Sequence, residues 1–372
     1  GSVFLSAYNK NINPVVYIGV IDKAKFKGKK FVSYSDVTTK PPVLGSKSAV
    51  WDGTAATYQQ VSTSSGKANF KNYDVVHDNQ TLAYGLLKLR DLGLPVVGTI
   101  HHPITMDKRI DIKHADTITL KILKWRWYSF LKMQIKVARK LDPIIVVSEN
   151  TRKDLIKDFK IDSKKTRKVL HGIDHETFHP IPSIKRKNNQ IITTASADVP
   201  LKGLIYLIRA YAELLKEFPD LELLVIGRLR EGPTDQELKK EGIKEKVRFI
   251  SDLTGRQIAE LYAESTLAVS PSVYEGFGFP AGEAMSCGIP LVSTNGGSLP
   301  EVVGDAAIVV PHSNPKALKD AIKSLLNSPE KRRDFGNRGR NRVLEKFTWK
   351  RAAKELVEVY REAIENANNR PR

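Results

Sequence analysis

Short apolar runs alternate with stretches of helical spacing along most of this chain. Apolar strands are predicted near residues 73–79, 94–100, 143–148, 168–170, 191–197, 221–227, 247–253, 267–269 and 306–310. Helical spacing of apolar residues separates or follows them at 81–92, 202–215, 315–326 and 329–367. Regular alternation of strand and helix is typical of an α/β fold, in which helices cover both faces of a parallel sheet.

The first 72 residues lack this regularity, with strand-like pieces only at 15–21 and 31–32. A chain of 372 residues is too long for one ordinary core and suits two domains. We place the N-terminal domain at 1–172, with 1–72 atypical, and the C-terminal domain at 173–350. A closing helix follows at 351–372. The polar, basic stretch SIKRKNN at 183–189 reads as a linker close to the junction.

Residues 270–303 combine a strand end, a glycine-broken loop and the start of a helix. Gly276 and Gly278 let a ligand approach the main chain without interference from a Cβ atom. Pro280 suits the first position of a helix, and Gly288 suits its end. The unpaired N–H groups and positive dipole of a helix start favour a phosphate. The stretch therefore predicts an anion-binding site.

Two carboxylates, Glu275 and Glu283, flank this loop with seven residues between them. Glu283, expected in the first helical turn, could bind a vicinal diol such as a ribose, because a carboxylate accepts two hydrogen bonds side by side. An acidic residue near a helix start is also ordinary dipole chemistry. The two residues alone leave both interpretations open.

The ordered run EGFGFPAGEAMSCGIPLV, followed by GGSLPEVV, resembles the signature of the retaining family 4 glycosyltransferases of the GT-B fold. The resemblance extends less strictly from about residue 73 to about 364. It implies two Rossmann-like domains facing across a cleft, with a C-terminal helix that crosses back to the first domain. It also implies that Glu283 binds the nucleotide ribose and that Glu275 lies near the donor sugar. Further donor contacts are then expected from Gly276, Phe277, Gly278, Phe279 and Pro280.

His101 and His102 follow the predicted strand at 94–100. Ligands gather outside the carboxyl ends of parallel strands, so both imidazoles are well placed for a site. The resemblance implies that His101 faces the donor sugar and the acceptor as a catalytic residue, whereas His102 is the weaker candidate. A histidine that only caps the strand is the alternative.

The loop after the predicted strand at 191–197 supplies a second set of candidates. The family carries an Arg and a Lys there, both on the donor diphosphate, and Lys202 matches the Lys. The Arg position falls at Ala197, or at Ser196 if the loop shifts by one, so one expected cation is missing. Arg228, on a glycine turn after the next strand, is a candidate to replace it, with an ordinary surface charge as the alternative.

The formal net charge of +19 implies a negatively charged partner, unless it reflects only a Lys-rich surface. Residues 117–141 contain no acidic residue, and Lys121, Lys124 and Lys132 recur at helical spacing opposite an apolar side with Trp and Tyr. This pattern is typical of a helix lying on an anionic membrane, and it is equally that of a domain helix that packs its apolar side into the core. No nucleic-acid partner is expected, because no basic motif carries interleaved aromatics.

One cysteine excludes an internal disulfide and a Cys-rich zinc site. No run of 18 apolar residues and no signal peptide is visible, so we expect a cytoplasmic protein, peripheral at the inner face of the membrane.

The leading hypothesis is a retaining glycosyltransferase that moves a sugar from a nucleotide-diphosphate sugar to an unknown acceptor, which is lipid-linked, a sugar or a small molecule. Lys202, Glu275 and His101 form the expected catalytic set. We expect no cofactor and no metal, because no Asp-x-Asp pair accompanies these strands. The alternatives are a catalytically weak homologue that binds a nucleotide sugar or a partner, and another GT-B enzyme such as a sugar-nucleotide epimerase.

Overall fold

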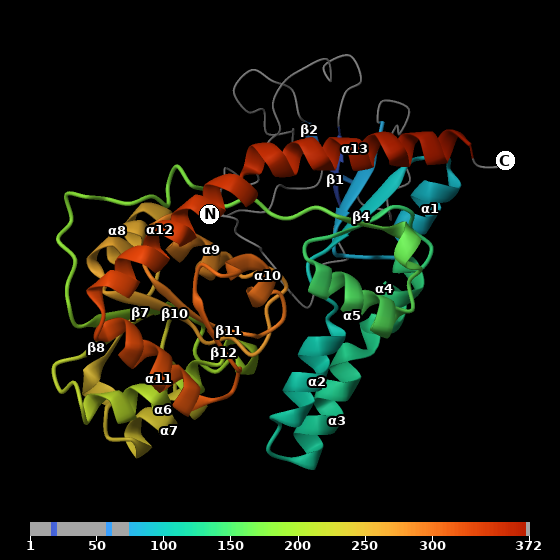
Figure 1. Cartoon of the computed structure of the whole chain (residues 1–372). Helices are drawn as coiled ribbons and strands as arrows, with labels where there is room; N and C mark the ends of the chain where they lie inside the picture. Colours follow the sequence, from blue (N-terminus) through green and yellow to red (C-terminus); the bar gives the residue numbers. More distant parts are fainter. Residues whose placement is uncertain (1–15, 21–56, 62–73, 370–372) are drawn as a thin grey trace.

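Two parallel sheets, each flanked by helices, organise the chain in the computed structural model (Figure 1). The structure describes residues 16–20, 57–61 and 74–369. The first two ranges are strands β1 (Val16–Val20) and β2 (Thr57–Val61), which pair antiparallel. β1 coincides with the strand-like piece at 15–21, whereas β2 was not predicted. The piece at 31–32 lies outside the described residues.

The first domain contains a four-stranded sheet in the order β3-β4-β5-β6, with every neighbouring pair parallel. Its strands are β3 (Val76–Asn79), β4 (Val96–Ile100), β5 (Ile144–Val146) and β6 (Thr166–Lys168). Helix α1 (Gly85–Asp91) follows β3, and α5 (Glu149–Phe159) follows β5. The helix predicted from residue 81 begins only at 85, because Gln80 and Leu82 have positive φ and the Asp78 carboxylate accepts the Leu82 N–H at 3.0 Å.

The second domain contains a six-stranded parallel sheet in the order β12-β11-β10-β7-β8-β9. Its strands are β7 (Gln190–Thr194), β8 (Glu222–Ile226), β9 (Val247–Ile250), β10 (Leu267–Ser270), β11 (Leu291–Thr294) and β12 (Ile308–Val310). The chain builds outward from β7 to β9, returns beside β7 as β10, and then builds outward in the opposite direction. This is the Rossmann strand order, and its switch point lies between β7 and β10.

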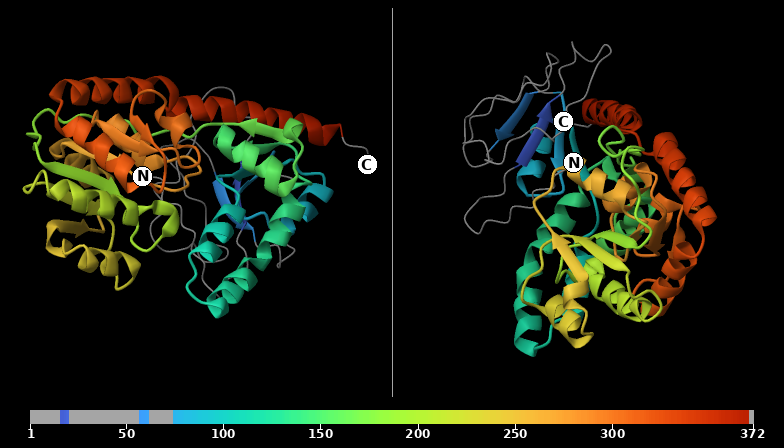
Figure 2. Two further views of the ribbon diagram at one scale, coloured as in Figure 1. Left: turned by 60° about the horizontal axis from the view of Figure 1, so that its bottom comes forward. Right: turned by 90° about the vertical axis from the view of Figure 1, so that its left-hand side faces the viewer.

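Helices cover both faces of the second sheet and leave its carboxyl edge to loops (Figure 2). They are α6 (Leu204–Leu215), α7 (Pro233–Lys240), α8 (Gly255–Glu264), α9 (Phe279–Ser286), α10 (Leu299–Val303) and α11 (Pro315–Leu326). Each face has its own buried apolar cluster; Leu207 and Val269 belong to one, and Met285 and Leu291 to the other. The predicted α/β fold with two Rossmann-like domains is confirmed.

The segment predicted as one basic helix over 117–141 is divided in the structure. It consists of α3 (Ile118–Trp127), a 3₁₀ turn at Tyr128–Phe130 and α4 (Leu131–Ala138). The break coincides with Tyr128, whose hydroxyl donates to the Asp111 carboxylate at 2.6 Å. Asp111 lies on the preceding helix α2 (Thr105–Lys113), and α2 and α3 together form a hairpin that projects from the first domain (Figure 1).

The chain ends with α12 (Pro329–Lys346) on the second domain and α13 (Trp349–Asn368) on the first. Phe347 and Thr348 separate them, and the Thr348 side chain caps α13 by accepting the Arg351 N–H. α13 packs Val359, Tyr360 and Ala363 against the sheet of the first domain. The closing helix therefore returns to the first domain, as predicted (Figure 1).

Candidate active site

The loops that follow β7 and β10 meet at the switch point of the second sheet. Lys202, at the end of the 3₁₀ turn Pro200–Lys202, donates to Glu275 Oε1 at 2.8 Å. Ser272 Oγ donates to the same oxygen at 2.8 Å. Gly203 has φ +63°, and a Cβ atom there would collide with the Pro271 carbonyl oxygen. The two loops thus pack backbone against backbone, which brings the predicted residues Lys202 and Glu275 together.

Ser298, which sequence reasoning missed, holds the Glu275 loop in place. Its N–H and its hydroxyl lie 2.9 and 3.0 Å from the Glu275 carbonyl oxygen, and the hydroxyl lies 2.9 Å from that of Phe277. The available signal was the GGS turn after β11, because the carboxyl end of β11 lies beside that of β10.

Helix α9 begins at Phe279, after Gly278 with φ +103°, and Pro280 lies in its first turn as predicted. Glu283 was expected in that first turn, but it is the fifth residue of the helix and begins the second turn. Its carboxyl group is shielded from water, which raises the pKa of Glu283 to about 7, and the negative charge of the nearby Asp174 raises it further. Within residues 74–369 the structure gives the Glu283 side chain no hydrogen-bond partner, so its oxygens are available for a ligand.

The first domain reaches this loop through the end of β4. A Cβ atom on Gly276 would collide with the His101 carbonyl oxygen, so the two main chains touch directly. The Thr151 hydroxyl lies 3.0 Å from the same His101 oxygen and 3.4 Å from that of Gly276. His101 and Glu275 therefore come from different domains but flank one backbone contact.

The His101 imidazole is held on both of its nitrogens. Nε2 lies 2.7 Å from Asn79 Oδ1, and Nδ1 lies 3.1 Å from His171 Nε2. Because an amide oxygen only accepts, Nε2 carries the proton and Nδ1 accepts from His171. Burial, and then the neighbouring His171, hold the pKa of His101 well below its usual range. The site contains a neutral imidazole in a defined tautomer.

His171 lies between the two domains, next to the predicted domain boundary at 172–173. Its ring stacks on His101 with centroids 5.2 Å apart, and it meets Phe277 at 5.2 Å, Phe279 at 5.1 Å and Trp349 at 6.2 Å. Burial lowers its pKa to about 4. Two of the predicted donor-loop residues, Phe277 and Phe279, thus support the His101 ring through His171.

Comparison with known proteins places this arrangement in a family. The model for Glycosyl transferases group 1 matches residues 175–342, and that for Glycosyltransferase Family 4 matches residues 52–177. The MMP alpha-(1->4)-mannosyltransferase of Mycolicibacterium hassiacum is 39% identical over 297 residues, which cover 79% of this chain and 71% of that protein. The chain belongs to family 4 of the GT-B glycosyltransferases. The D-inositol 3-phosphate glycosyltransferase of Saccharomonospora viridis is 25% identical over 313 residues, covering 78% and 70% of the two chains.

Solved structures show the same fold at lower identity. Sucrose-phosphate synthase from Thermosynechococcus elongatus superposes with a TM-score of 0.66 and 21% identity, covering 80% of this chain and 75% of that one. Anabaena Alr3699/HepE, solved in complex with UDP, gives a TM-score of 0.64 and 20% identity, with 78% and 79% covered.

Among the described residues, the remaining donor-side candidates of this glycosyltransferase, Ser196 and Arg228, make no hydrogen bond to Lys202 or Glu275. Ser196 is exposed, and the structure shows no hydrogen bond from its side chain to the other described residues. Arg228 is exposed and donates to Asp252 at 2.7 Å. Its turn nevertheless abuts the first loop, because a Cβ atom on Gly227 would collide with the Ala195 carbonyl oxygen. A donor-binding role for Ser196 and Arg228 stays a prediction.

His102, the weaker histidine candidate, turns away from His101. Its Nε2 lies 2.8 Å from Asp107 Oδ2 on α2, and its ring lies 6.2 Å from that of Tyr274. In the part of the chain that the structure describes, no three His, Cys, Asp or Glu side chains gather as a metal-binding group.

Proposed function

We propose that this glycosyltransferase moves a hexosyl group from a nucleoside diphosphate sugar to an acceptor, with retention of the anomeric configuration. The observation that carries the proposal is the ion pair of Lys202 with Glu275 at the switch point, in direct backbone contact with the His101 segment of the other domain. The cation, the carboxylate and the histidine come from loops at three separate strand ends, and Rossmann-like sheets bind their ligands at such ends.

The chemistry requires stabilisation of a departing diphosphate. Lys202, whose side chain is about one-third exposed, can exchange its Glu275 partner for a phosphate oxygen. The N-terminus of α9 offers backbone N–H groups and a positive dipole end beside the same loop. Together they would neutralise the leaving group without a metal ion, with Glu283 holding the nucleotide ribose.

The sugar would lie between Glu275 and His101. Release from Lys202 leaves Glu275 able to accept hydrogen bonds from sugar hydroxyl groups, while Ser298 keeps its backbone in place. The protonated Nε2 of His101 is a donor for the sugar or the acceptor once its bond to Asn79 is exchanged. These contacts act by positioning and by electrostatic stabilisation of an oxocarbenium-like sugar.

We propose mannose as the transferred sugar, because the relative at 39% identity is named a mannosyltransferase. The test is a thermal-shift screen with uridine, guanosine and adenosine diphosphate conjugates of mannose and glucose, followed by turnover with mannoside, inositol and lipid acceptors. The expected result is one preferred mannose donor and a product whose anomeric configuration, assigned by NMR, matches that of the donor. An inverted product would refute retention, and a preferred glucose donor would refute mannose.

His101→Ala provides the residue-level arm of this test. We expect turnover to fall about a hundredfold, with nucleotide affinity retained, because the ring acts in positioning and not in nucleotide binding. His179→Ala, at an exposed histidine of the junction segment, is the matched control and is expected to behave as the parent. Near-parental turnover of His101→Ala would make His101 a structural residue.

A second candidate function, a homologue that binds the donor but transfers poorly, is favoured by one observation. The cation that the family places at Ser196 or Ala197 is missing, and Arg228 pairs with Asp252. Donor binding without turnover on every acceptor class would select this candidate. Conversion of the donor sugar in the absence of any acceptor would instead select an epimerase.

A further inference from the structure

Helix α3 is exposed along its length although six of its ten residues are large and apolar. Every residue of α3 except Lys124 is exposed. The exposed fraction is 77% for Ile118, 59% for Ile122 and 62% for Trp125. The expected alternative, a helix that packs into the core, holds only for α4, which buries Leu131, Gln134, Val137 and Ala138. The large apolar side chains of α3 are therefore exposed, although α2 lies beside the helix.

The spacing on α3 gathers its most exposed apolar side chains on one face. Ile118, Ile122 and Trp125 stand at i, i+4 and i+7, so they line a single stripe of the helix. Lys121 and Arg126 border this stripe, one on each side. At 100° per residue Lys121 lies about 40° from Trp125, and Arg126 lies about 40° from Ile122. An apolar stripe with a Trp, bordered by cations, is the pattern of a helix that lies in a membrane interface.

Helix α2 holds α3 with this stripe outward. Lys124 Nζ donates to the Asp111 carbonyl oxygen at 3.1 Å, and the Tyr128 hydroxyl donates to the Asp111 carboxylate at 2.6 Å. Lys124 lies about 130° around the helix from the middle of the apolar stripe at 100° per residue, and Tyr128 belongs to the 3₁₀ turn that follows α3. Lys108 of α2 places its ammonium group 5.5 Å from the Trp125 ring centroid, which adds a third cation at the edge of the stripe.

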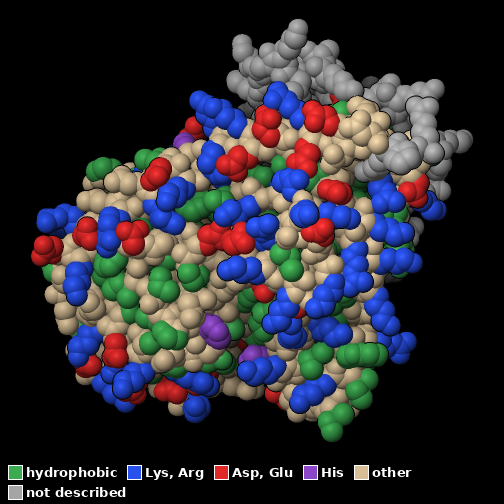
Figure 3. Space-filling view, turned by 45° about the vertical axis from the view of Figure 1, so that its right-hand side comes forward, with side chains coloured by type: hydrophobic (Ala, Val, Ile, Leu, Met, Phe, Trp, Pro, Cys, Tyr) green, Lys and Arg blue, Asp and Glu red, His purple; other side chains and the backbone are tan. Residues whose placement is uncertain are grey.

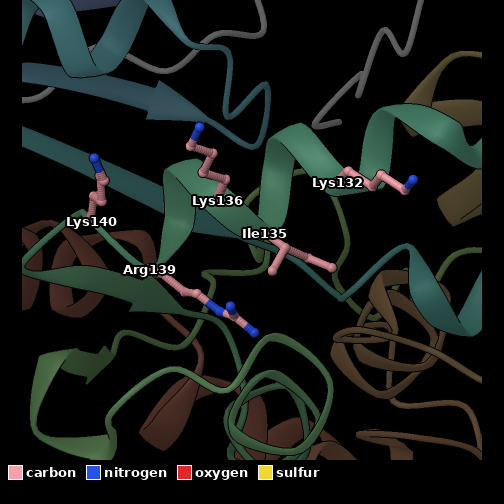
Figure 4. A pocket seen from close by; sticks show the side chains of 5 residues that line it. All are labelled: Lys132, Ile135, Lys136, Arg139 and Lys140. Carbon is pink, nitrogen blue, oxygen red and sulfur yellow. The ribbon is translucent and has the colours of Figure 1, made fainter.

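The basic surface continues from α3 onto α4. Lys132, Ile135, Lys136, Arg139 and Lys140 line a shallow groove of about 460 Å³ with no acidic residue (Figure 4). Between residues 105 and 140 the chain carries ten Lys or Arg residues and three Asp residues. Figure 3 shows this side of the molecule, with hydrophobic side chains at the tip of the α2–α3 hairpin and Lys and Arg side chains above them.

We propose that the α2–α3 hairpin docks this protein on an anionic lipid bilayer. Ile118, Ile122 and Trp125 enter the interface between headgroups and acyl chains, and Lys121 and Arg126 bind lipid phosphates. The charge of the segment selects an anionic surface over a neutral one. No helix in the described part of the chain has the length and apolar character to cross a membrane. The hairpin is thus a surface anchor and not a span.

Docking through this hairpin would bring the active site to the membrane. α2 starts at Thr105, directly after the His101–His102 segment, so the anchor and the catalytic histidine are linked by a few residues. If the proposed transfer holds, the acceptor would be presented at the lipid surface. The docking itself does not depend on the transfer and is tested without it.

The apolar stripe is tested by co-sedimentation with vesicles of phosphatidylcholine alone or mixed with phosphatidylglycerol. We expect the parent to bind the anionic vesicles and Ile122→Ser/Trp125→Ser to bind them about tenfold or more weakly. Leu92→Ser/Leu344→Ser, which removes two exposed leucines elsewhere, is the matched control and should bind as the parent does. Circular dichroism confirms that the variants are folded.

The basic border is tested with Lys121→Gln/Arg126→Gln. Loss of two charges near the surface should weaken binding to anionic vesicles about thirtyfold, at about 1 kcal/mol per charge, and change little on neutral vesicles. Lys346→Gln/Lys350→Gln, at two exposed lysines where α12 ends and α13 begins, is the matched control. Quenching of tryptophan emission by lipids brominated on the acyl chain should be strong in the parent and weak in Trp125→Phe.

Three outcomes would overturn the proposal. The first is that the parent does not bind anionic vesicles, and the second is that the α3 variants bind as well as their controls. The third is that the parent binds no vesicles but self-associates in sedimentation velocity, and that the α3 variants do not self-associate. The last would identify a second copy as the occupant of the stripe. Donor affinity in solution is measured on the same variants. Normal donor affinity without vesicle binding refutes the docking proposal alone, whereas loss of donor binding by the parent refutes the proposed function.

Discussion

The carboxyl group of Glu283 changes its protonation state near neutral pH. Its pKa is raised to about 7, first by burial and then by Asp174. Because the folded value lies above the unfolded one, the shift stabilises the fold at low pH, and this contribution is lost as pH rises through about 7. A ribose diol donates two hydrogen bonds and therefore prefers the ionised form. Binding and folding thus favour opposite protonation states.

Replacing Glu283 with Gln should separate the two effects. We expect nucleotide affinity to fall by about 1.5–3 kcal/mol above pH 7.5 or so, the usual scale for hydrogen bonds to a charged group. Parent affinity should rise between about pH 6 and about pH 8, whereas Glu283→Gln should be nearly flat over that range. Isothermal titration calorimetry at several pH values measures both. Equal affinities for the two proteins would refute the ribose assignment, and the exposed Glu330→Gln serves as control.

At the scale of elements, the site depends on loops that meet through glycine. Gly276 lets the loop after β10 touch the end of β4, and Gly203 lets the turn that carries Lys202 touch the same loop. Side chains at these positions would separate the elements that bear His101, Lys202 and Glu275. Backbone atoms of the His101 segment and of the Gly276 loop therefore form this contact between the domains.

Gly276→Ala should therefore disturb the domain contact. We expect the free energy of unfolding to fall by about 1–3 kcal/mol, because a backbone oxygen cannot rotate out of the way of the new Cβ atom. Turnover should fall more than nucleotide affinity, since Glu283 keeps its place on α9. The control is Gly242→Ala, where φ is +67° but nothing lies within 4 Å, so that only about 1 kcal/mol of strain is expected. Equal unfolding energies and normal turnover for both variants would contradict the role of Gly276.

At the scale of the whole molecule, α13 ties the end of the chain to the first sheet. His77 links three elements, with Nδ1 2.5 Å from the Tyr360 hydroxyl on α13 and Nε2 2.7 Å from Thr99 Oγ1 on β4. Burial lowers the pKa of His77 to about 4. Arg167 pairs with Glu362 of α13 at 2.5 Å. The neutral form of His77 thus helps to hold α13 against the sheet of the first domain.

This arrangement predicts a pH-dependent part of stability. A histidine with a depressed folded pKa contributes stability that is present above its unfolded pKa, about 6.5, and is lost as pH falls towards about 4. We expect His77 to contribute about 2–3 kcal/mol to this loss. His77→Gln should be less stable than the parent at neutral pH and lose less stability on acidification, as measured by urea unfolding. His179→Gln should match the parent, and a parallel pH profile for His77→Gln would contradict the prediction.

Local patterns were sufficient for most of the framework. Apolar runs identified β4 and β10, and the glycine loop with Pro280 identified the start of α9, because these features depend on neighbouring residues. β2, the break at Tyr128 and the late start of α1 were missed. The break at Tyr128 depends on Asp111, whose carboxylate accepts the Tyr128 hydroxyl. The late start of α1 depends on Asp78, whose carboxylate accepts the Leu82 N–H. Periodicity does not report such local hydrogen bonds.

The sequence by itself determined the strand order along the chain, the Glu275–Glu283 spacing and the presence of Lys202 and His101. Only the tertiary structure decided that Lys202 pairs with Glu275, that Asn79 and His171 set the tautomer of His101, and that Ser298 holds the loop. It also decided that α3, with the same basic and apolar spacing as α4, remains exposed. The physical reason is that hydrogen bonding, protonation and burial depend on groups far apart in sequence, which meet only when the two sheets and the closing helix are packed together.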